Sequence, residues 1–165
     1  IQQILLLAVY HAQRRLVLTS PYFVPDDPLV AALRSAAERG VQVQLILPAR
    51  NDSFMVRHAS DAFIAELLES GVQVFRFKNG LLHTKSVLVD DCLALIGSVN
   101  LDRRSFWLNF ETTLLVDDVH FAAELAELLE HYKQQATRLY LSQWNRRPWP
   151  KRLLENLLYL FSPLL

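Results

Sequence analysis

Two short segments of the chain carry residues whose types and spacing suit phosphodiester chemistry. His83, Lys85 and Asp90 lie in HTKSVLVD, and after six intervening residues comes Gly97-Ser98-Val99-Asn100. A neutral imidazole can attack phosphorus and hold a covalent phospho-intermediate, while ammonium, hydroxyl and carboxamide groups can bind the phosphoryl oxygens. Each residue alone is typical of a structural role. Together, at this spacing and in a single copy, they favour a catalytic site that is half complete.

Strand alternation divides these residues between two faces of the predicted sheet. His83 and Lys85 are two residues apart and should share one face, as should Ser98 and Asn100 on the next strand, so the two pairs can meet across a hairpin. Asp90 is seven residues from His83, which is an odd separation. We therefore expect Asp90, although part of the catalytic motif, to support the turn or a neighbouring backbone and not to contact the phosphate.

A nucleophilic imidazole needs an acceptor at its other ring nitrogen, because that contact fixes the tautomer. Glu111 is the best candidate, since it lies among Leu108, Phe110 and Leu114 at the start of a predicted strand. A carboxylate in apolar surroundings must find a partner or stay at the edge. We therefore expect Glu111 to orient His83.

Hydrophobic periodicity and Pro/Gly breaks predict the elements that position these residues. Expected helices cover 1–14, 26–38, 51–70 and 121–141, and expected strands cover 16–19, 41–47, 72–77, 84–89, 93–99 and 112–116. The first half alternates strands and helices, which indicates parallel βαβ units. Asp90-Asp91 then marks a hairpin between the next two strands. The expected fold class is α/β, a mixed β-sheet flanked by helices on both faces.

Composition narrows the classes of partner and cofactor. Lys plus Arg and Asp plus Glu number 17 each, so the net charge is zero, which argues against a nucleic-acid partner. Cys92 is the single cysteine, so neither an intrachain disulfide nor a cysteine-rich zinc site is expected. HExxH spacing and glycine-rich phosphate loops are missing from the sequence, so we expect no metal and no nucleotide cofactor. The chain begins with Ile1, which suggests a piece of a longer protein.

The motif HxKxxxxD, six residues, GSxN resembles the signature of the phospholipase D superfamily, and His83, Lys85, Asp90, Gly97, Ser98 and Asn100 fill its defining positions. The flanks narrow the resemblance, over essentially the whole chain, to the C-terminal half of bacterial cardiolipin synthases. They read TSPYFVPDD, LILPARNDS, GLLHTKSVLVDD, GSVNLDRRSFWLNFE and FSPLL. Glu111 also falls where members of the superfamily place an acidic residue that hydrogen-bonds the catalytic histidine.

The resemblance implies a phosphatidyltransferase built from two such motifs that face each other across a pseudo-twofold axis. Residues 1–145 would then be a phospholipase D-like catalytic domain, the second half of the site. An N-terminal half or a second copy in a homodimer would complete it. A phosphatidyl group from phosphatidylglycerol would pass through a phosphohistidine to a second phosphatidylglycerol, with release of glycerol and with no metal or cofactor.

Other residues are weaker candidates. Tyr22 follows the first strand and either lines the substrate site or packs in the core. For Asp52 we expect a helix cap, and a contact to substrate is the second choice. Arg103 and Arg104 follow the motif and either face a lipid phosphate or lie in a solvated loop. The four remaining histidines are expected to be non-catalytic: His11, His58, His120 and His131.

The C-terminal tail, residues 146–165, is rich in leucine beside basic and aromatic residues. This composition is typical of an interfacial segment at a membrane surface, the alternative being packing on the missing half. The sequence has no run of ~18 apolar residues that would span a bilayer. The resemblance places the protein at the bacterial inner membrane.

Two other functions stay open on the sequence. A homodimeric endonuclease or phosphodiesterase of the same superfamily has a similar length, but zero net charge and the leucine-rich tail argue against it. A non-catalytic dimerisation or binding module is the second. The complete motif argues against that module, because a decayed site is expected to lose His83 or Lys85.

Overall fold

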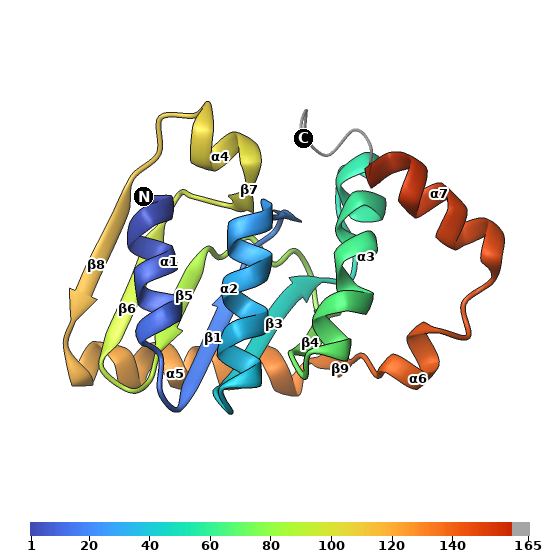
Figure 1. Ribbon diagram of the computed structural model, residues 1–165. Coiled ribbons are helices and arrows are strands. Elements are labelled where there is room, and N and C mark those ends of the chain that lie inside the picture. Colours follow the sequence, from blue (N-terminus) through green and yellow to red (C-terminus); the bar gives the residue numbers. More distant parts are fainter. Residues whose placement is uncertain (160–165) are drawn as a thin grey trace.

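A seven-stranded mixed sheet forms the centre of the molecule (Figure 1). The computed structural model describes residues 1–159, apart from the side chains of residues 151, 152, 156 and 159. The strand order is β8-β6-β5-β1-β3-β4-β9. Their bounds are β1 Arg15–Thr19, β3 Gln42–Pro48, β4 Gln73–Phe77, β5 Ser86–Val89, β6 Leu93–Gly97, β8 Thr113–Asp117 and β9 Ala136–Arg138.

Helices cover both faces of this sheet, which confirms the predicted fold class. Helices α1 (Gln2–His11), α2 (Asp27–Glu38) and α3 (Phe54–Glu69) lie on one face, and α5 (Val119–Gln134) lies on the other (Figure 1). Alternation along the strands produces the two layers. In β1, Leu16 and Leu18 pack into the core cluster under α1–α3, whereas Val17 packs with Leu125 and Leu129 of α5.

The first half of the chain forms the expected parallel units. Strand β1 pairs in parallel with β3, and β3 pairs in parallel with β4. Helices α2 and α3 are the crossovers, capped at their N-termini by Asp26 and Ser53. Strands β5 and β6 form the predicted antiparallel hairpin, and β5 joins the parallel half by pairing antiparallel with β1.

Three features differ from the sequence-based expectation. The last long helix ends at Gln134 and not near 141, because residues 136–138 form β9, which gives β4 a second neighbour through an antiparallel ladder. A two-stranded parallel sheet joins β2 (Phe23–Val24) to β7 (Leu101–Asp102). A short helix, α4 (Arg103–Trp107), follows β7 directly.

The C-terminal segment packs on the same domain. Helix α6 (Leu141–Trp144) leads to α7 (Trp149–Tyr159), and α7 contacts α3. Buried Glu155 on α7 accepts a hydrogen bond of 2.7 Å from Arg147, whose guanidinium stacks on Trp144. The tail described at residues 146–159 is therefore tied to the domain, whereas residues 160–165 lie outside the described part, as do the side chains of Lys151 and Arg152.

Gly97 is the residue of β6 that faces the backbone of Thr112 and Thr113, where β8 begins. A β-carbon at this position would lie 2.1 Å from the carbonyl oxygen of Thr112 and 2.8 Å from the Cα of Thr113. Both neighbours are backbone atoms, which cannot rotate away. Glycine is required here by space, whereas Gly40, at φ 91° with open surroundings, is required by its backbone angle.

We expect Gly97→Ala to lower the free energy of unfolding by about 2 kcal/mol or more, because the methyl group must displace β8. Gly40→Ala is the matched control, and its positive φ should cost about 1 kcal/mol. Urea unfolding of both variants measures the difference. Equal losses would contradict the close approach of the two strands at Gly97.

Candidate active site

The two motif segments meet at one edge of the sheet, beside the start of β5 and the end of β6. The N–H of Gly97 donates to the carbonyl oxygen of Lys85 over 3.3 Å. Beneath this bond, Ser86 hydrogen-bonds the hydroxyl of Thr19 on β1 at 2.8 Å, and both side chains are buried. The N–H of Leu101 donates to Ser20 at 3.0 Å. The edge is thus fixed from β1 on one side and β6 on the other.

His83 and Lys85 are neighbours in space. The ammonium of Lys85 lies 2.9 Å from Nδ1 of His83 and donates to the His83 carbonyl oxygen at 2.9 Å. Both residues precede β5, which begins at Ser86. Lys85 therefore lies outside the strand that was expected over residues 84–89. The same ammonium also lies 3.4 Å from Nε2 of His83, so the lysine faces the edge of the ring that carries both nitrogens.

Lys85 is partly buried, and its desolvation lowers the pKa of its ammonium below the usual value. The carboxylates of Glu111 and Asp102 act in the opposite direction and favour the charged form. The site therefore contains a partly desolvated cation whose charged form is favoured by two carboxylates. Such a cation has a strong field for an incoming phosphoryl group, because part of its water has been removed.

Ser98 is held by the chain that leads into β8. Its hydroxyl donates to the carboxylate of Glu111, and it accepts from the N–H of Thr112 at 3.0 Å. Glu111 also accepts from Asn109 at 3.2 Å. Glu111 thus contacts Ser98 and Asn109 in the structure, and its expected role in orienting His83 stays a prediction. The carboxylate binds the hydroxyl because both leave neighbouring strands at the same edge, whereas Nδ1 faces Lys85.

Asn100 and the cap of α4 form the other wall. The amide of Asn100 donates to Ser105 at 3.3 Å, and its Oδ1 is buried without a hydrogen-bond partner among the described residues. Asp102 caps α4 by accepting from the N–H of Ser105 at 2.7 Å. Burial raises the pKa of Asp102, with backbone and hydroxyl hydrogen bonds from Ser105 opposing the rise. Asp102 and Ser105 were not foreseen as site residues, although the spacing DRRS is a capping signal.

Asp90 lies at the opposite end of β5 and supports backbone, as its odd spacing predicted. Its carboxylate accepts from the N–H groups of Gln13, Arg14 and Arg15, the shortest at 2.7 Å. Burial raises its pKa, but these backbone hydrogen bonds outweigh the rise, and the pKa is lowered overall. Asp90 also adopts φ 51°, which closes the hairpin turn.

The weaker candidates occupy the rim. The hydroxyl of Tyr22 lies 2.9 Å from both oxygens of Asp52, and burial together with this carboxylate raises the pKa of Tyr22. Asp52 thus binds Tyr22, while Ser53 is the residue that caps α3. Arg103 contacts Asp27 at 3.4 Å, and Arg104 is exposed. The negative charge of Asp102 also raises the pKa of Tyr22.

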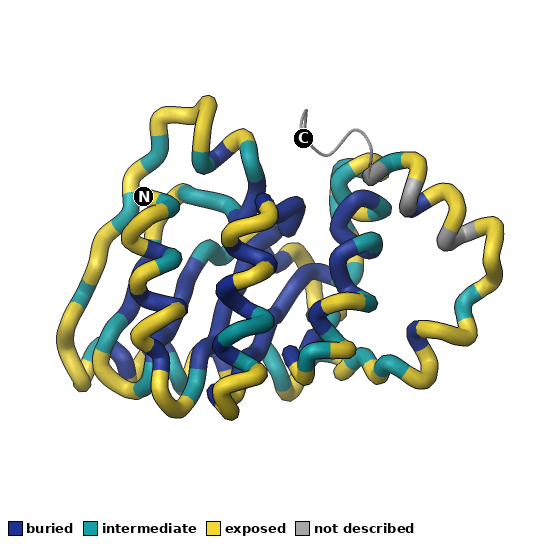
Figure 2. Tube along the Cα trace, in the orientation of Figure 1, coloured by how far each residue is buried: buried dark blue, intermediate teal, exposed yellow. Residues whose placement is uncertain are grey.

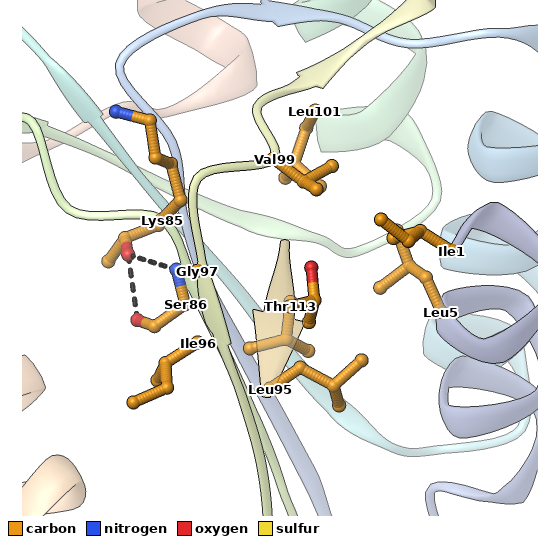
Figure 3. A pocket seen from close by; sticks show the side chains of 12 residues that line it. Ile1, Leu5, Lys85, Ser86, Leu95, Ile96, Gly97, Val99, Leu101 and Thr113 are labelled. Carbon is orange, nitrogen blue, oxygen red and sulfur yellow. Dashed lines mark hydrogen bonds between the residues drawn. The ribbon is translucent and has the colours of Figure 1, made fainter. Parts of the chain in front are cut away.

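A small apolar hollow of about 30 Å³ lies behind the motif strands, between β5, β6 and α1 (Figure 3). Thr19, Ser86, Leu95, Gly97 and Leu101 are among its lining residues. Lys85 borders it, but its ammonium points away from the enclosed side chains (Figure 3). The hollow is therefore unsuited to a phosphate, and the polar groups for phosphate lie outside it at the sheet edge.

Residues 5–133 match the protein family described as cardiolipin synthase, PLD-like domain. The chain belongs to this family. Cardiolipin synthase A of Proteus mirabilis is 55% identical over 165 residues, which are 100% of this chain and 34% of that protein. The enzyme of the same name from Pectobacterium atrosepticum is 53% identical over the same shares. The chain thus spans about a third of the length of these relatives.

Solved structures share the fold. Phosphatidylserine synthase of Haemophilus influenzae superposes with a TM-score of 0.80 at 21% identity, over 99% of this chain and 44% of that one. Nuc of Salmonella typhimurium, a phospholipase D family member, superposes with a TM-score of 0.75 at 20% identity, over 84% of this chain and 90% of that one. These similarities establish the architecture of this member of the family.

The part of the chain that the structure describes contains no group of three or more His, Cys, Asp or Glu side chains arranged to hold a metal ion. Within the same residues, none of the helices combines the length and the apolar character needed to cross a bilayer.

We expect Asp90→Asn to lower the free energy of unfolding by about 1 kcal/mol at neutral pH, because the neutral amide is a weaker acceptor for three N–H groups. Asparagine tolerates the positive φ, so the change isolates the charge. The lowered carboxyl pKa stabilises the fold above the usual value near ~3.9 and loses this effect as pH falls through the folded value.

The difference between wild type and Asp90→Asn should therefore shrink as the pH falls below ~4. Urea unfolding at several pH values tests this. Asp117→Asn, an exposed position on β8, is the control and should change stability by less than about 0.5 kcal/mol. A pH-independent difference for Asp90→Asn would rule out the charged role.

Proposed function

We propose that this chain is one half of the active site of a cardiolipin synthase. The supporting observation is the meeting of the two motif segments, where the bond between Gly97 and the Lys85 carbonyl brings His83, Lys85 and Ser98 to one edge. Family membership over residues 5–133 gives the chemistry to expect there. The site residues are His83 and Lys85 for catalysis, Ser98 and Asn100 for phosphate, and Asp90 for support.

The reaction is phosphatidyl transfer between two phosphatidylglycerol molecules. An imidazole nitrogen attacks the phosphorus of the first lipid, a P–N bond forms, and the P–O bond to glycerol breaks. The leaving glycerol oxygen takes a proton from the second histidine of the complete site. That histidine then removes the proton from the hydroxyl of the second lipid, whose oxygen displaces the first histidine. Cardiolipin and glycerol are the products.

Each group of this half has a task in that reaction. Lys85 supplies positive charge to the equatorial phosphoryl oxygens, where negative charge increases. The hydroxyl of Ser98 exchanges its bond with Glu111 for a phosphoryl oxygen. This exchange frees the Glu111 carboxylate, which lies close enough to influence the charge of Lys85. Once Lys85 has turned toward the phosphate, Glu111 can accept a hydrogen bond from the Nδ1–H group of His83.

The other half of the site comes from outside this chain, because two histidines are needed and the motif occurs once. An N-terminal half of the same polypeptide is the partner we favour, since the relatives are about three times as long. A second copy in a homodimer is the alternative. Phosphatidylglycerol in the bacterial inner membrane is the substrate, so the complete enzyme works at a membrane surface.

Substitution of the motif histidine tests the function. In the complete polypeptide that carries this chain, His83→Asn should lower cardiolipin formation from phosphatidylglycerol at least about a hundredfold, because either histidine role is lost. His120→Asn, at an exposed histidine on α5, is the control and should retain wild-type activity. Wild-type-like activity of His83→Asn would refute the assignment.

The half-site predicts the behaviour of the 165-residue chain by itself. We expect little or no transferase activity from its monomer, because one histidine cannot both hold the phosphatidyl group and protonate glycerol. Activity assays on fractions of known mass from size-exclusion chromatography with light scattering measure this. Robust synthesis by a monomeric fraction would contradict the half-site, while activity confined to a dimer would identify a second copy as the completing half.

A further inference from the structure

The C-terminal end of α4 and the residues that follow it expose three large apolar side chains. Trp107 is 69% exposed, Leu108 is 72% exposed and Phe110 is 107% exposed. We refer to these three residues as the α4 ridge. Helix α4 and the chain that follows it stand out beyond the edge of the sheet, and this part is largely exposed (Figures 1 and 2). Exposed aromatic side chains at a protruding tip carry a cost in water that a partner would remove.

The exposed charge on the α4 ridge segment is positive. Residues 103–110 contain two arginines and no acidic residue. The flanking carboxylates of Asp102 and Glu111 are hydrogen-bonded within the site, to Ser105 and to Ser98. Arg104 is exposed, and Arg103 is held near Asp27 at 3.4 Å. A free cation one helical turn before an exposed tryptophan matches the arrangement of lipid phosphates above an acyl layer. The segment is thus complementary to an anionic lipid surface.

Helix α4, which carries the start of the α4 ridge, is hydrogen-bonded to the catalytic motif. Helix α4 is capped by Asp102 through the N–H of Ser105, and buried Ser105 accepts from Asn100 of the motif. Strand β7, which precedes α4, pairs with β2 in the body of the domain. A surface that holds the ridge therefore also sets the depth of Ser98 and Asn100 relative to that surface.

Shape distinguishes the α4 ridge from a second apolar stripe, which lies on α1. Ile4, Leu7 and Tyr10 repeat every three residues along a helix and are about half exposed. That continuous stripe suits a protein surface, whereas a protruding tip suits insertion between headgroups.

We infer that the α4 ridge inserts into the headgroup layer of an anionic phospholipid bilayer and holds the motif at the depth of the lipid phosphates. Arg104 contacts the phosphates, and Trp107, Leu108 and Phe110 reach the acyl boundary. This inference deepens the proposed function, on which it rests for the lipid substrate. It assigns to this chain its own membrane contact, separate from the C-terminal segment.

Vesicle binding with a tryptophan readout tests the inference. The chain contains three tryptophans, of which Trp144 is buried and Trp149 is exposed. In a Trp149→Phe variant, the fluorescence of Trp107 reports the environment of the α4 ridge. Vesicles of equal parts phosphatidylglycerol and phosphatidylcholine should shift its emission to the blue, and brominated acyl chains should quench it. An unchanged emission spectrum in the presence of bound vesicles would overturn the inference.

Matched variants test the contribution to affinity. We expect Trp107→Ser with Phe110→Ser to weaken partition into these vesicles by roughly tenfold or more, because two aromatic side chains leave the interface. Leu7→Ser with Tyr10→Ser removes similar area from α1 and should leave partition unchanged. Arg104→Ala should weaken partition severalfold at low salt and little at high salt. Equal partition of wild type into pure phosphatidylcholine would overturn the anionic-lipid assignment.

Two further measurements separate the possible outcomes. If the ridge variant lowers self-association in light scattering and leaves vesicle partition unchanged, the ridge binds a second copy and the inference is wrong. In the complete polypeptide, the ridge variant should keep transfer between short-chain lipids dispersed below their micelle concentration and lose it on vesicles. Failure of His83→Asn to affect either assay would refute the proposed function and leave the vesicle-binding result standing.

Discussion

The close approach of β6 to β8 at Gly97 is the constraint on which the site depends. With no side chain at this position, the Thr112 carbonyl can lie where a β-carbon would be, and Ser98 can bond Thr112 on both sides. The same glycine donates its N–H to Lys85. One residue without a side chain therefore joins three neighbouring segments, which bring the lysine, the serine and Glu111 together. A larger residue would separate the phosphate-binding groups from the catalytic pair.

The charged and polar groups at this edge of the sheet interact with one another. Lys85 is partly desolvated, and Glu111 and Asp102 favour its charged form. Ser98 occupies one oxygen of Glu111. In the proposed reaction, a phosphoryl group would offer Lys85 and Ser98 new oxygen acceptors and so release Glu111, the carboxylate that sequence reasoning assigned to His83.

The sequence predicted the parallel half of the fold, the hairpin and the support role of Asp90, because these follow from alternation, glycine breaks and an odd spacing. It did not predict β9, since residues 136–138 continue a helical pattern and become a strand only because β4 offers an open edge. Nor did it predict that His83 and Lys85 precede β5, because strand ends are set by which backbone groups find ladder partners. The partner of Glu111 was missed for a related reason. His83 and Ser98 lie at the same edge, and either can donate a hydrogen bond to the Glu111 carboxylate. Only their distances from this carboxylate in the folded structure decide which of them does.

The apolar surface that remains exposed is distributed in a way that a complete enzyme would need. A half-site must meet another protein surface and a bilayer at once, and one surface cannot serve both. The stripe on α1 is continuous and regular, whereas the α4 ridge is short, protruding and next to arginines. The ridge is bonded to Asn100 through Ser105, while α1 contacts α2 and borders the apolar hollow behind the motif. Contact of the α4 ridge with a bilayer would therefore act on the motif through Asn100, whereas in the proposed complete site the half that supplies the second histidine must reach the same edge of the sheet as His83.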